Sequence, residues 1–489
     1  MWAGLALCLS FPAPSLFFLA WGALAPFLAF IRWAGNKKTL LFGHFLMASI
    51  YLGGVLYWIP SVLIDFGGLR NWTAWMLWAL MILGLGVFLL PFTLISSFSA
   101  RYGNEMFLLG APAAWMLTEL LRNYLAINGF PWAALGYTQF HFPLLTQCAD
   151  IGGVYFVSGV VVLINVVILA LFWSEKRVLK WGGAVVLLLL FYGGYRLWIW
   201  TPEETGTVRA GLLQGNIALQ ESREYYAEKY FSTLPALAEK AWSEQAEWII
   251  LPEAQCPYFF DRDFYFRTFW ERKSDQTGSH ILLNSTRIGR ERVGRYYNSA
   301  YLLAPGQGVS YIYDKVHLVP FGEFLPFANL LFFAQPLVSE VSSYTPGEEI
   351  KPGFIKGFPF GTLICYEAVF PELGRSNAGK GAEILVNITN DLWYGDTAAP
   401  EQHLQIAAFR SIENRRTLLR AANSGFTAVV DPWGRVKQKT RLFTEDCLVS
   451  DALLYSGLSL FTHLGDIPVL LIIIASGVCL IVRYRRKSG

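Results

Sequence analysis

Long apolar stretches alternate with short charged clusters over the first 199 residues. A membrane-spanning helix needs about 20 apolar residues, within a range of about 17–25, and most of these stretches reach that length. They lie at residues 2–13, 14–31, 39–60, 72–98, 105–127, 150–173 and 181–199. Pro12 and Pro14 interrupt the first run, which leaves one long span or a helical hairpin as alternatives. The pattern predicts an α-helical membrane domain with about seven spans over residues 1–199.

A last apolar stretch at residues 467–482 predicts a C-terminal transmembrane helix, and the basic residues after it form a tail at 483–489. Cytoplasmic loops carry an excess of Lys and Arg. Seven spans with a cytoplasmic N-terminus satisfy this rule and place residues 200–466 outside the cytoplasm. Six spans would place that segment inside. We predict the first topology, with the basic tail in the cytoplasm.

Residues 200–466 show a different pattern, in which short β-branched runs end in polar residues. These runs lie at 208–213, 248–251, 281–283, 361–364 and 384–386. Helical patterns at 223–246 and 401–415 fall between or after the runs. Strands that alternate with helices predict an α/β domain, and the chemistry of such domains collects beyond the carboxyl ends of the strands.

Composition supports this division of the chain. Hydrophobic residues make up 54% of it and charged residues only 15%, whereas soluble domains average about 25% charged. This excludes a wholly soluble enzyme and a disordered chain. Residues 1–199 hold ten basic and five acidic residues, so the shortage of charge lies in the membrane part. No sustained basic patch with interleaved aromatic residues occurs, so nucleic acid is not a predicted partner.

Two charged residues lie within the stretch at 105–127. Glu119 and Arg122 are three positions apart and share one face of a helix. Ionisable residues at membrane depth usually pair or mark a site, and both alternatives stay open. The aromatic segment that follows is interpreted as an interfacial loop, in which Trp132 is a membrane anchor or, alternatively, a ligand contact.

Three residues in the α/β part carry the chemistry of acyl transfer to a thiol. Glu253, Lys315 and Cys365 each follow or border a strand-like run. A thiol is a good nucleophile once it loses its proton, and a nearby carboxylate can take that proton. An ammonium group can stabilise the oxyanion that follows. A lone Cys after a strand is more often a small core residue, so the hypothesis depends on the whole set.

The flanks of these residues resemble the nitrilase (carbon–nitrogen hydrolase) superfamily. The matching pieces are Leu251-Pro-Glu253, Tyr297-Asn-Ser-Ala300, Asp314-Lys315 and Cys365-Tyr-Glu367. This resemblance implies an α-β-β-α sandwich in which Glu253, Lys315 and Cys365 are catalytic. Four further pieces, together with the arrangement of spans, resemble the apolipoprotein N-acyltransferase family. They are residues 315–326, 214–216, 130–132 and 390–395.

The second resemblance implies an enzyme of the bacterial inner membrane whose catalytic domain faces the periplasm. It implies transfer of a fatty acyl chain from a phospholipid, through a thioester on Cys365, to the α-amine of the diacylglyceryl-cysteine of apolipoproteins. One alternative is a membrane-anchored amidase or nitrilase that hydrolyses a small amide. Another is a transporter or scaffold with an inactive nitrilase-like domain.

Several further residues are candidates for supporting roles. Glu323 is expected to orient Lys315 and Glu367 to fix the loop beside the nucleophile, with ordinary hydrogen-bonded carboxylates as the alternative. Possible substrate or lipid contacts are Tyr366, Asn390, Trp393, Tyr394, Trp132, Phe332 and Phe333. The last two belong to an apolar segment after Glu323 that is too short to span. We predict a mobile arm that dips into the membrane, with burial in the core as the alternative.

Cysteine and histidine spacing suggests neither a metal site nor a cofactor. Cys256 and Cys447 lie in the predicted extracytoplasmic segment, and their spacing leaves open whether they pair. Cys365 has to stay free in order to act. No heptads or signs of a symmetric interface occur, so a monomer is the default expectation.

Overall fold

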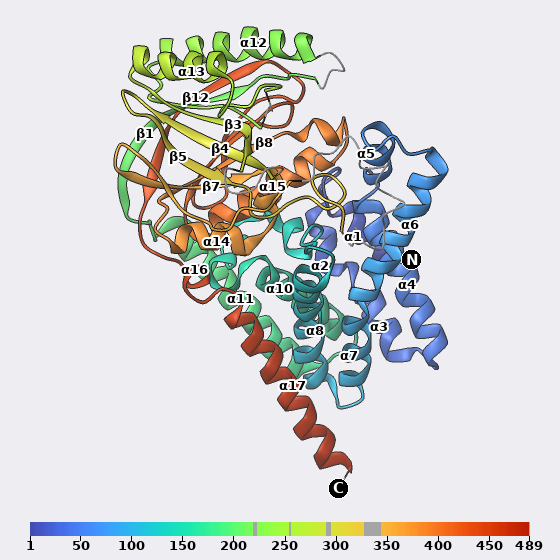
Figure 1. Cartoon of the computed structure of the whole chain (residues 1–489). Coiled ribbons are helices and arrows are strands. Elements are labelled where there is room, and N and C mark those ends of the chain that lie inside the picture. The colour runs from blue at the N-terminus through green and yellow to red at the C-terminus, as the bar shows by residue number, and fades with distance from the viewer. Residues whose placement is uncertain (219–222, 254–255, 290–294, 327–343, 489) are drawn as a thin grey trace. The chain divides into compact units, whose positions relative to one another are not determined.

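The computed structural model describes residues 1–218, 223–253, 256–289, 295–326 and 344–488 (Figure 1). The chain divides into two compact units. The helical unit comprises Met1–Thr201, Thr397–Phe409 and Ser459–Gly489, and the sheet unit comprises Pro202–Asp396 and Arg410–Leu458. The first border lies within two residues of the expected limit at 199/200. Residues 397–409 and 459–466, expected in the α/β domain, group with the helical unit instead.

The helical unit is built almost entirely from helices. In the first half of the unit they are α1 Trp2–Leu9, η1 Phe17–Leu19, α2 Ala20–Ala23, α3 Ala25–Trp33, α4 Lys37–Val55, α5 Ile59–Asp65, α6 Asn71–Phe88 and α7 Leu90–Ala100. The remainder are α8 Asn104–Leu125, η2 Leu135–His141, α9 Pro143–Thr146, α10 Ala149–Phe172, α11 Lys176–Trp198, α16 Leu460–Leu464 and α17 Ile467–Ser488.

Five helical segments of the described residues are long and apolar enough to cross a membrane. They are Lys37–Val55, Asn71–Ala100, Ala149–Phe172, Lys176–Trp198 and Ile467–Lys487. A shorter apolar helical stretch covers Phe17–Trp33. The unit therefore has the character of a polytopic membrane domain, while the expected number of seven spans before residue 200 stays a prediction.

Three of the expected stretches differ in detail from continuous apolar helices. The stretch at 72–98 is divided into α6 and α7, and Pro91 stands in the first turn of α7, where its missing N–H costs no helix hydrogen bond. The stretch at 2–13 forms only the eight residues of α1. α8 has 22 residues, but it carries Glu119 and Arg122 in its buried part.

Buried polar side chains connect the helices of this unit to one another. Asn165 on α10 accepts hydrogen bonds from the N–H groups of Leu24 (2.8 Å) and Ala25 (3.1 Å), which begin α3. It also donates to the carbonyl of Ala20 at 2.7 Å. Free backbone groups at a helix start are costly without water, so Asn165 fixes the approach of these two segments.

The sheet unit contains two six-stranded sheets in its described residues. The first sheet has the order β12-β1-β2-β3-β4-β5, and the second has the order β11-β10-β9-β8-β7-β6. The strands of the first sheet are β1 Glu204–Gln214, β2 Trp248–Ile250, β3 His280–Ile288, β4 Tyr296–Ala304, β5 Gly308–Asp314 and β12 Asp446–Tyr455. Those of the second are β6 Gly353–Ile355, β7 Phe358–Ile364, β8 Ile384–Thr389, β9 Thr417–Ala422, β10 Ala428–Val430 and β11 Val436–Lys439.

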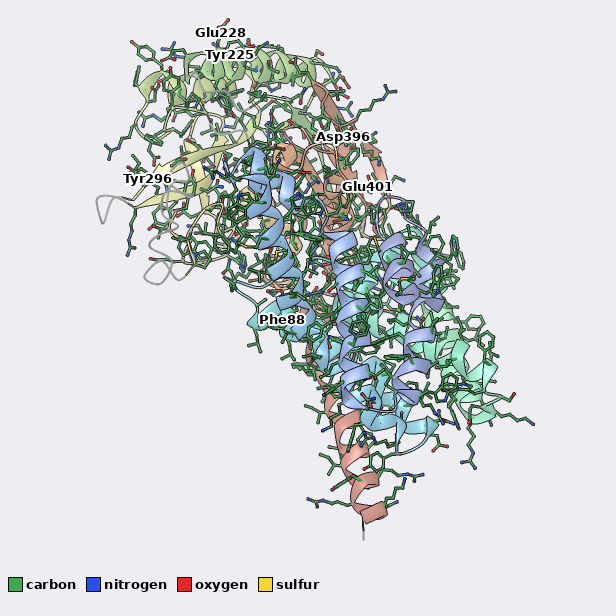
Figure 2. The ribbon with its side chains drawn as sticks, turned by 90° about the vertical axis from the view of Figure 1, so that its right-hand side faces the viewer. Phe88, Tyr225, Glu228, Tyr296, Asp396 and Glu401 are labelled. Carbon is green, nitrogen blue, oxygen red and sulfur yellow. The ribbon has the colours of Figure 1, made fainter. Side chains whose placement is uncertain are left out.

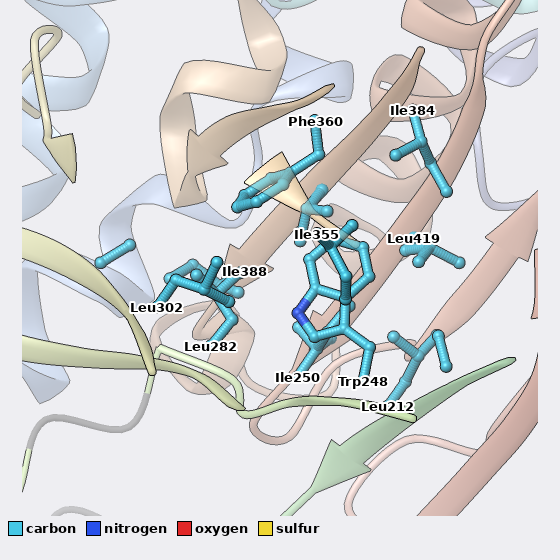
Figure 3. Close-up of a cluster of buried hydrophobic side chains, with 14 of the residues drawn as sticks. Leu212, Trp248, Ile250, Leu282, Leu302, Ile355, Phe360, Ile384, Ile388 and Leu419 are labelled. Atoms are coloured by element: carbon cyan, nitrogen blue, oxygen red, sulfur yellow. The ribbon is translucent and has the colours of Figure 1, made fainter. Parts of the chain in front are cut away.

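The two sheets bury a common apolar core between them (Figure 3). Trp248 of the first sheet lies against Phe360 of the second, with ring centroids 4.9 Å apart. Both side chains are fully buried. Side chains alternate between the faces of a strand, so the opposite face of each sheet is left for helices.

Helices cover these outer faces. α12 Arg223–Ser243 and α13 Phe264–Thr277 share a second buried cluster with the first sheet. Tyr226 and Tyr230 of α12 point inward, while Tyr225 and Glu228 point outward (Figure 2). Among the described residues, the other helical elements of this unit are η4 Cys365–Val369, α14 Pro371–Gly379, η5 Asp391–Tyr394 and the last part of α15 Ala399–Asn414.

α14 packs on β7 of the second sheet, so helices lie against both sheets and the α-β-β-α sandwich is confirmed. The five predicted strand runs correspond to β1, β2, β3, β7 and β8, although the run at 248–251 extends one residue beyond β2. The two predicted helices correspond to α12 and α15, which end three residues and one residue earlier than expected. α15 is shared, because its residues up to Phe409 belong to the helical unit and those from Arg410 to the sheet unit.

Candidate active site

The structure brings Glu253, Lys315 and Cys365 together within the sheet unit. Glu253 follows β2, Lys315 directly follows β5, and Cys365 directly follows β7. The Glu253 Oε1 and Lys315 Nζ atoms are 4.0 Å apart, and the carboxyl group of Glu253 lies near enough to the thiol of Cys365 for each to influence the pKa of the other. Their exposed fractions are only 7%, 1% and 8%. A carboxyl group, an ammonium group and a thiol therefore share one buried site.

Cys365 stands at a sharp turn from strand into helical backbone. Its φ is +51°, in the left-handed region that non-glycine residues rarely adopt, at a cost of about 1–3 kcal/mol. The Glu367 carboxylate stabilises this turn, because it accepts a 2.7 Å hydrogen bond from the N–H of Ile364. The thiol at this turn lies near Glu253.

Glu367 also connects the Cys365 turn to the lysine segment. Its Oε1 accepts hydrogen bonds from the hydroxyl of Tyr313 (2.9 Å) and the N–H of Val316 (2.8 Å), on either side of Lys315. Burial raises the pKa of Glu367 to about 7, although its backbone hydrogen bonds and the charge of Lys315 oppose that rise. This geometry agrees with the loop-fixing role that we predicted for Glu367.

Glu323 lies against the lysine, as its expected orienting role requires. Its Oε1 is 2.8 Å from the Nζ of Lys315, and its Oε2 accepts a hydrogen bond from the N–H of Val319. Glu323 is therefore fixed at both oxygens and holds the ammonium group in place.

Asn298 of β4 belongs to a run that resembles the nitrilase superfamily, and no role was predicted for it. The structure places it at the centre of the site. Its amide donates to the Oε1 of Glu253 at 2.8 Å and to the Oε1 of Glu323 at 3.0 Å. It accepts from the amide of Asn284 on the neighbouring strand at 2.7 Å. The sequence pattern predicted the polar end of β3 but not the contact between Asn298 and Glu253, because that contact depends on the register in which β4 pairs with β3.

Burial raises the pKa of Glu253 above its usual range. The positive charge of Lys315 opposes this rise, whereas the negative charge of Glu323 adds to it. Hydrogen bonds from Asn298 and Cys365 favour the ionised form. A carboxyl group that is easier to protonate is better suited to exchange protons near neutral pH.

The nucleophile and the cation respond to burial in different ways. Burial and the charge of Glu253 raise the pKa of the Cys365 thiol, so the resting sulfur is protonated. Burial lowers the pKa of Lys315, but the carboxylates of Glu323 and Glu253 raise it by more, so the ammonium stays charged. The site therefore combines a neutral thiol with a permanent cation.

The predicted substrate contacts in the sheet unit have different positions. The N–H of Asn390 donates to the Oε2 of Glu253 at 3.1 Å, so this residue positions the carboxylate. Tyr366 is buried, and its ring packs edge-on against Phe370 with centroids 5.0 Å apart. Tyr394 lies near Cys365, whereas Trp393 is 38% exposed. Their roles as substrate contacts stay predictions.

Two other sets of candidates lie elsewhere. Trp132 belongs to the helical unit, where it is 1% exposed and donates a 2.7 Å hydrogen bond to Gln402, so it is not a lipid-facing anchor. A role as a ligand contact stays untested. The predicted arm with Phe332 and Phe333 lies in 327–343, outside the described residues.

Glu119 and Arg122 are both buried in the helical unit. Glu119 accepts 2.7 Å hydrogen bonds from the indole of Trp115 and the N–H of Leu135, so it ties α8 to η2. This supports the structural interpretation of Glu119. Cys256 and Cys447, whose pairing was left open, are both described by the structure and are not joined by a disulfide bond.

Both parts of the chain match known protein families. Residues 209–455 match the family model described as carbon-nitrogen hydrolase, and residues 3–167 match that of the apolipoprotein N-acyltransferase N-terminal domain. The chain is 33% identical to an apolipoprotein N-acyltransferase of Geobacter metallireducens, over 99% of this chain and 95% of the relative. It is 28% identical to that of Photobacterium profundum, over 100% and 95%.

Among solved structures, the chain is similar to a carbon-nitrogen hydrolase from Helicobacter pylori. The identity is 20%, and the match covers 50% of this chain and 88% of that one with a TM-score of 0.39.

Proposed function

Because the chain belongs to the apolipoprotein N-acyltransferase family, we propose that it transfers a fatty acyl chain from a membrane phospholipid to the α-amine of the diacylglyceryl-cysteine of bacterial apolipoproteins. The observation that carries the proposal is the buried cluster of Glu253, Lys315 and Cys365 in the sheet unit. The apolar helices of the other unit support the proposal, because an enzyme held in a membrane has direct access to a phospholipid donor.

In the first half-reaction, Glu253 accepts the proton of the nearby Cys365 thiol. The thiolate attacks the ester carbonyl of the phospholipid, and a C–S bond forms as the carbonyl oxygen becomes an oxyanion. Lys315 stabilises that oxyanion because its ammonium is buried and remains charged. When the intermediate collapses, Glu253 returns the proton to the leaving alcohol, and a lysophospholipid departs.

In the second half-reaction, the neutral amine of the lipoprotein attacks the thioester on Cys365. A C–N bond forms, Glu253 accepts a proton from the nitrogen, and the C–S bond breaks. Glu253 then reprotonates the sulfur. An amide is more stable than a thioester, so this half-reaction runs downhill. One carboxyl group serves both halves, which fits the raised pKa of Glu253.

Acyl labelling of the protein tests the mechanism. Purified protein is incubated with phospholipid labelled in its acyl chain, and label that neutral hydroxylamine removes is measured. We expect such label on the wild type and on Cys479→Ala, a matched exposed thiol in the helical unit, but not on Cys365→Ala. Addition of a diacylglyceryl peptide should move the label into a hydroxylamine-resistant amide. Release of ammonia from a small amide without any acyl-protein would favour an amidase and contradict the proposal.

We also propose that the enzyme lies in the bacterial inner membrane as a monomer, with the sheet unit on the periplasmic side. The distribution of basic residues supports this orientation. A reporter that is active only in the cytoplasm, fused after Trp200, should remain inactive. An active reporter would show that the sheet unit faces the cytoplasm, but it would not contradict the proposed chemistry.

A further inference from the structure

A group of buried polar side chains lies on the outer face of the second sheet, behind the Cys365 turn. Val386, Ile388 and Leu419 of β8 and β9 point into the core between the sheets. Asn387, Thr389 and Arg420 alternate with them and therefore point to the opposite face. These three side chains and Asp391 are at most 1% exposed. The mechanism above uses none of them.

An ion pair anchors this group. The Nη2 of Arg420 is 2.7 Å from the Oδ2 of Asp391, and its Nη1 donates to the Oδ1 of Asn387. A guanidinium can only donate, so it turns the amide nitrogen of Asn387 away from itself. That nitrogen donates to the carbonyl oxygens of Leu363 (2.9 Å) and Cys365 (3.4 Å). Arg420 thus helps to hold the backbone of the nucleophile.

Thr389 connects the ion pair to the sulfur. β7 and β8 run parallel with Ile364 opposite Ile388, so Cys365 and Thr389 are the next residues on neighbouring strands. The Thr389 hydroxyl donates to the Oδ1 of Asp391 at 3.1 Å, and it lies near enough to the Cys365 thiol to lower the pKa of that thiol. One hydroxyl has one proton, so it can donate to only one of these two groups at a time.

We propose that Thr389 is a further catalytic residue, whose hydroxyl turns its hydrogen bond from Asp391 to the sulfur of Cys365 whenever that sulfur carries negative charge. This inference rests on the proposed function, because the charge arises when the thiol is deprotonated and when the amine expels it from the thioester. Arg420 and Asp391 are positioning residues that keep Thr389 beside the sulfur.

The charges around Cys365 show why such a donor is needed. The groups that face it are Glu253, Lys315, Asp391 and Tyr394. Burial, together with the charges of Glu253 and Asp391, raises the pKa of the thiol, whereas the charge of Lys315 and the nearby hydroxyl of Thr389 lower it. Lys315 is itself shared with Glu323. A neutral hydroxyl stabilises the thiolate without drawing charge away from Lys315.

Thiol alkylation tests the proposal without requiring acyl transfer. The full chain, purified in detergent, reacts with iodoacetamide over a pH series, and modification of the Cys365 peptide is followed by mass spectrometry. We expect Thr389→Val to raise the pH midpoint of Cys365 alkylation by about one unit. This corresponds to about tenfold less thiolate at a given pH. Thr389→Ser keeps the hydroxyl and should stay near the wild-type midpoint.

Thr417→Val is the matched control. Thr417 is also buried, and its hydroxyl donates to the carbonyl of Leu453 at 2.6 Å. It is the first residue of β9 and stands at the end of that strand away from Thr389. We expect no shift for this variant. An unchanged midpoint in Thr389→Val, or equal shifts in the Val and Ser variants, would overturn the proposal. If Thr389→Val does not fold, Thr389→Ala is judged by the same criteria. If label from the phospholipid never appears on Cys365 but Thr389→Val still shifts the midpoint of alkylation, the proposed function is wrong and the role of Thr389 beside the sulfur stands.

Discussion

The two units both bury polar side chains, but they differ in the partners that those side chains have. In the helical unit, Asn165 binds backbone groups at a helix start, and Glu119 binds one backbone N–H group and one indole. In the sheet unit, Glu253 is bound by other functional side chains, among them Asn298 and Cys365. A buried polar group that satisfies backbone stabilises the fold, whereas one surrounded by titratable groups is available for chemistry.

This comparison predicts that substitutions in the sheet unit change the reaction and that substitutions in the helical unit change the stability. The largest effect is expected for Cys365→Ala. Its thiol forms the proposed thioester, so acyl transfer should be lost completely while the melting temperature changes little. Acyl labelling and thermal unfolding in detergent measure the two properties. Residual acylation with the same product in Cys365→Ala would show that the nucleophile is another residue.

The second largest effect is expected for Lys315→Met, which keeps the length of the side chain and removes its charge. Loss of an oxyanion donor typically lowers kcat by about 100- to 1,000-fold. Lys356→Met, which removes an exposed lysine paired with Glu247, serves as the control. A loss that appears only in KM would contradict the oxyanion role.

A smaller effect of the opposite kind is expected for Asn165→Leu. Leaving buried donors and acceptors unsatisfied costs about 1–3 kcal/mol, so the apparent melting temperature should fall by several degrees. Acyl labelling at low temperature should persist, because Asn165 belongs to the helical unit. Asn71→Leu at the exposed start of α6 is the control. Loss of labelling at full stability would break the comparison.

The smallest effect is expected for Glu323→Gln, as a shift in the pH dependence of kcat/KM. The charge of Glu323 raises the pKa of Glu253, so its removal should lower that pKa and keep Glu253 ionised at lower pH. The acid limb of kcat/KM should therefore move to lower pH. Glu239→Gln, on the surface of α12, should leave the limb in place. Movement to higher pH would contradict the assignment of Glu253 as the base.

Sequence patterns predicted the elements of the sheet unit better than those of the helical unit. Buried strands such as β1 and β8 end in polar residues, and that local signal is independent of register. β4, β5 and the edge strands lack it and were not predicted. In the helical unit, hydropathy marked apolar segments but could not show that α6 and α7 are separate helices, because a proline in the first turn of a helix leaves hydropathy unchanged.

The candidate site was also only partly predictable. Glu253, Lys315 and Cys365 stand at strand ends with recognisable flanks, so the sequence alone determined the nucleophile, the base and the cation as candidates. It also determined that the chain has an apolar helical part and an α/β part, because hydropathy and periodicity are local properties of the chain.

Tertiary structure alone decided which groups control those residues. Asn298 reaches Glu253 because β4 pairs with β3 in one particular register, and Thr389 lies beside Cys365 because β8 pairs with β7. It likewise decided that Trp132 is buried rather than exposed. Hydrogen bonds and charge interactions act over a few ångströms in space, and the residues that they join here are separated along the chain by tens of residues.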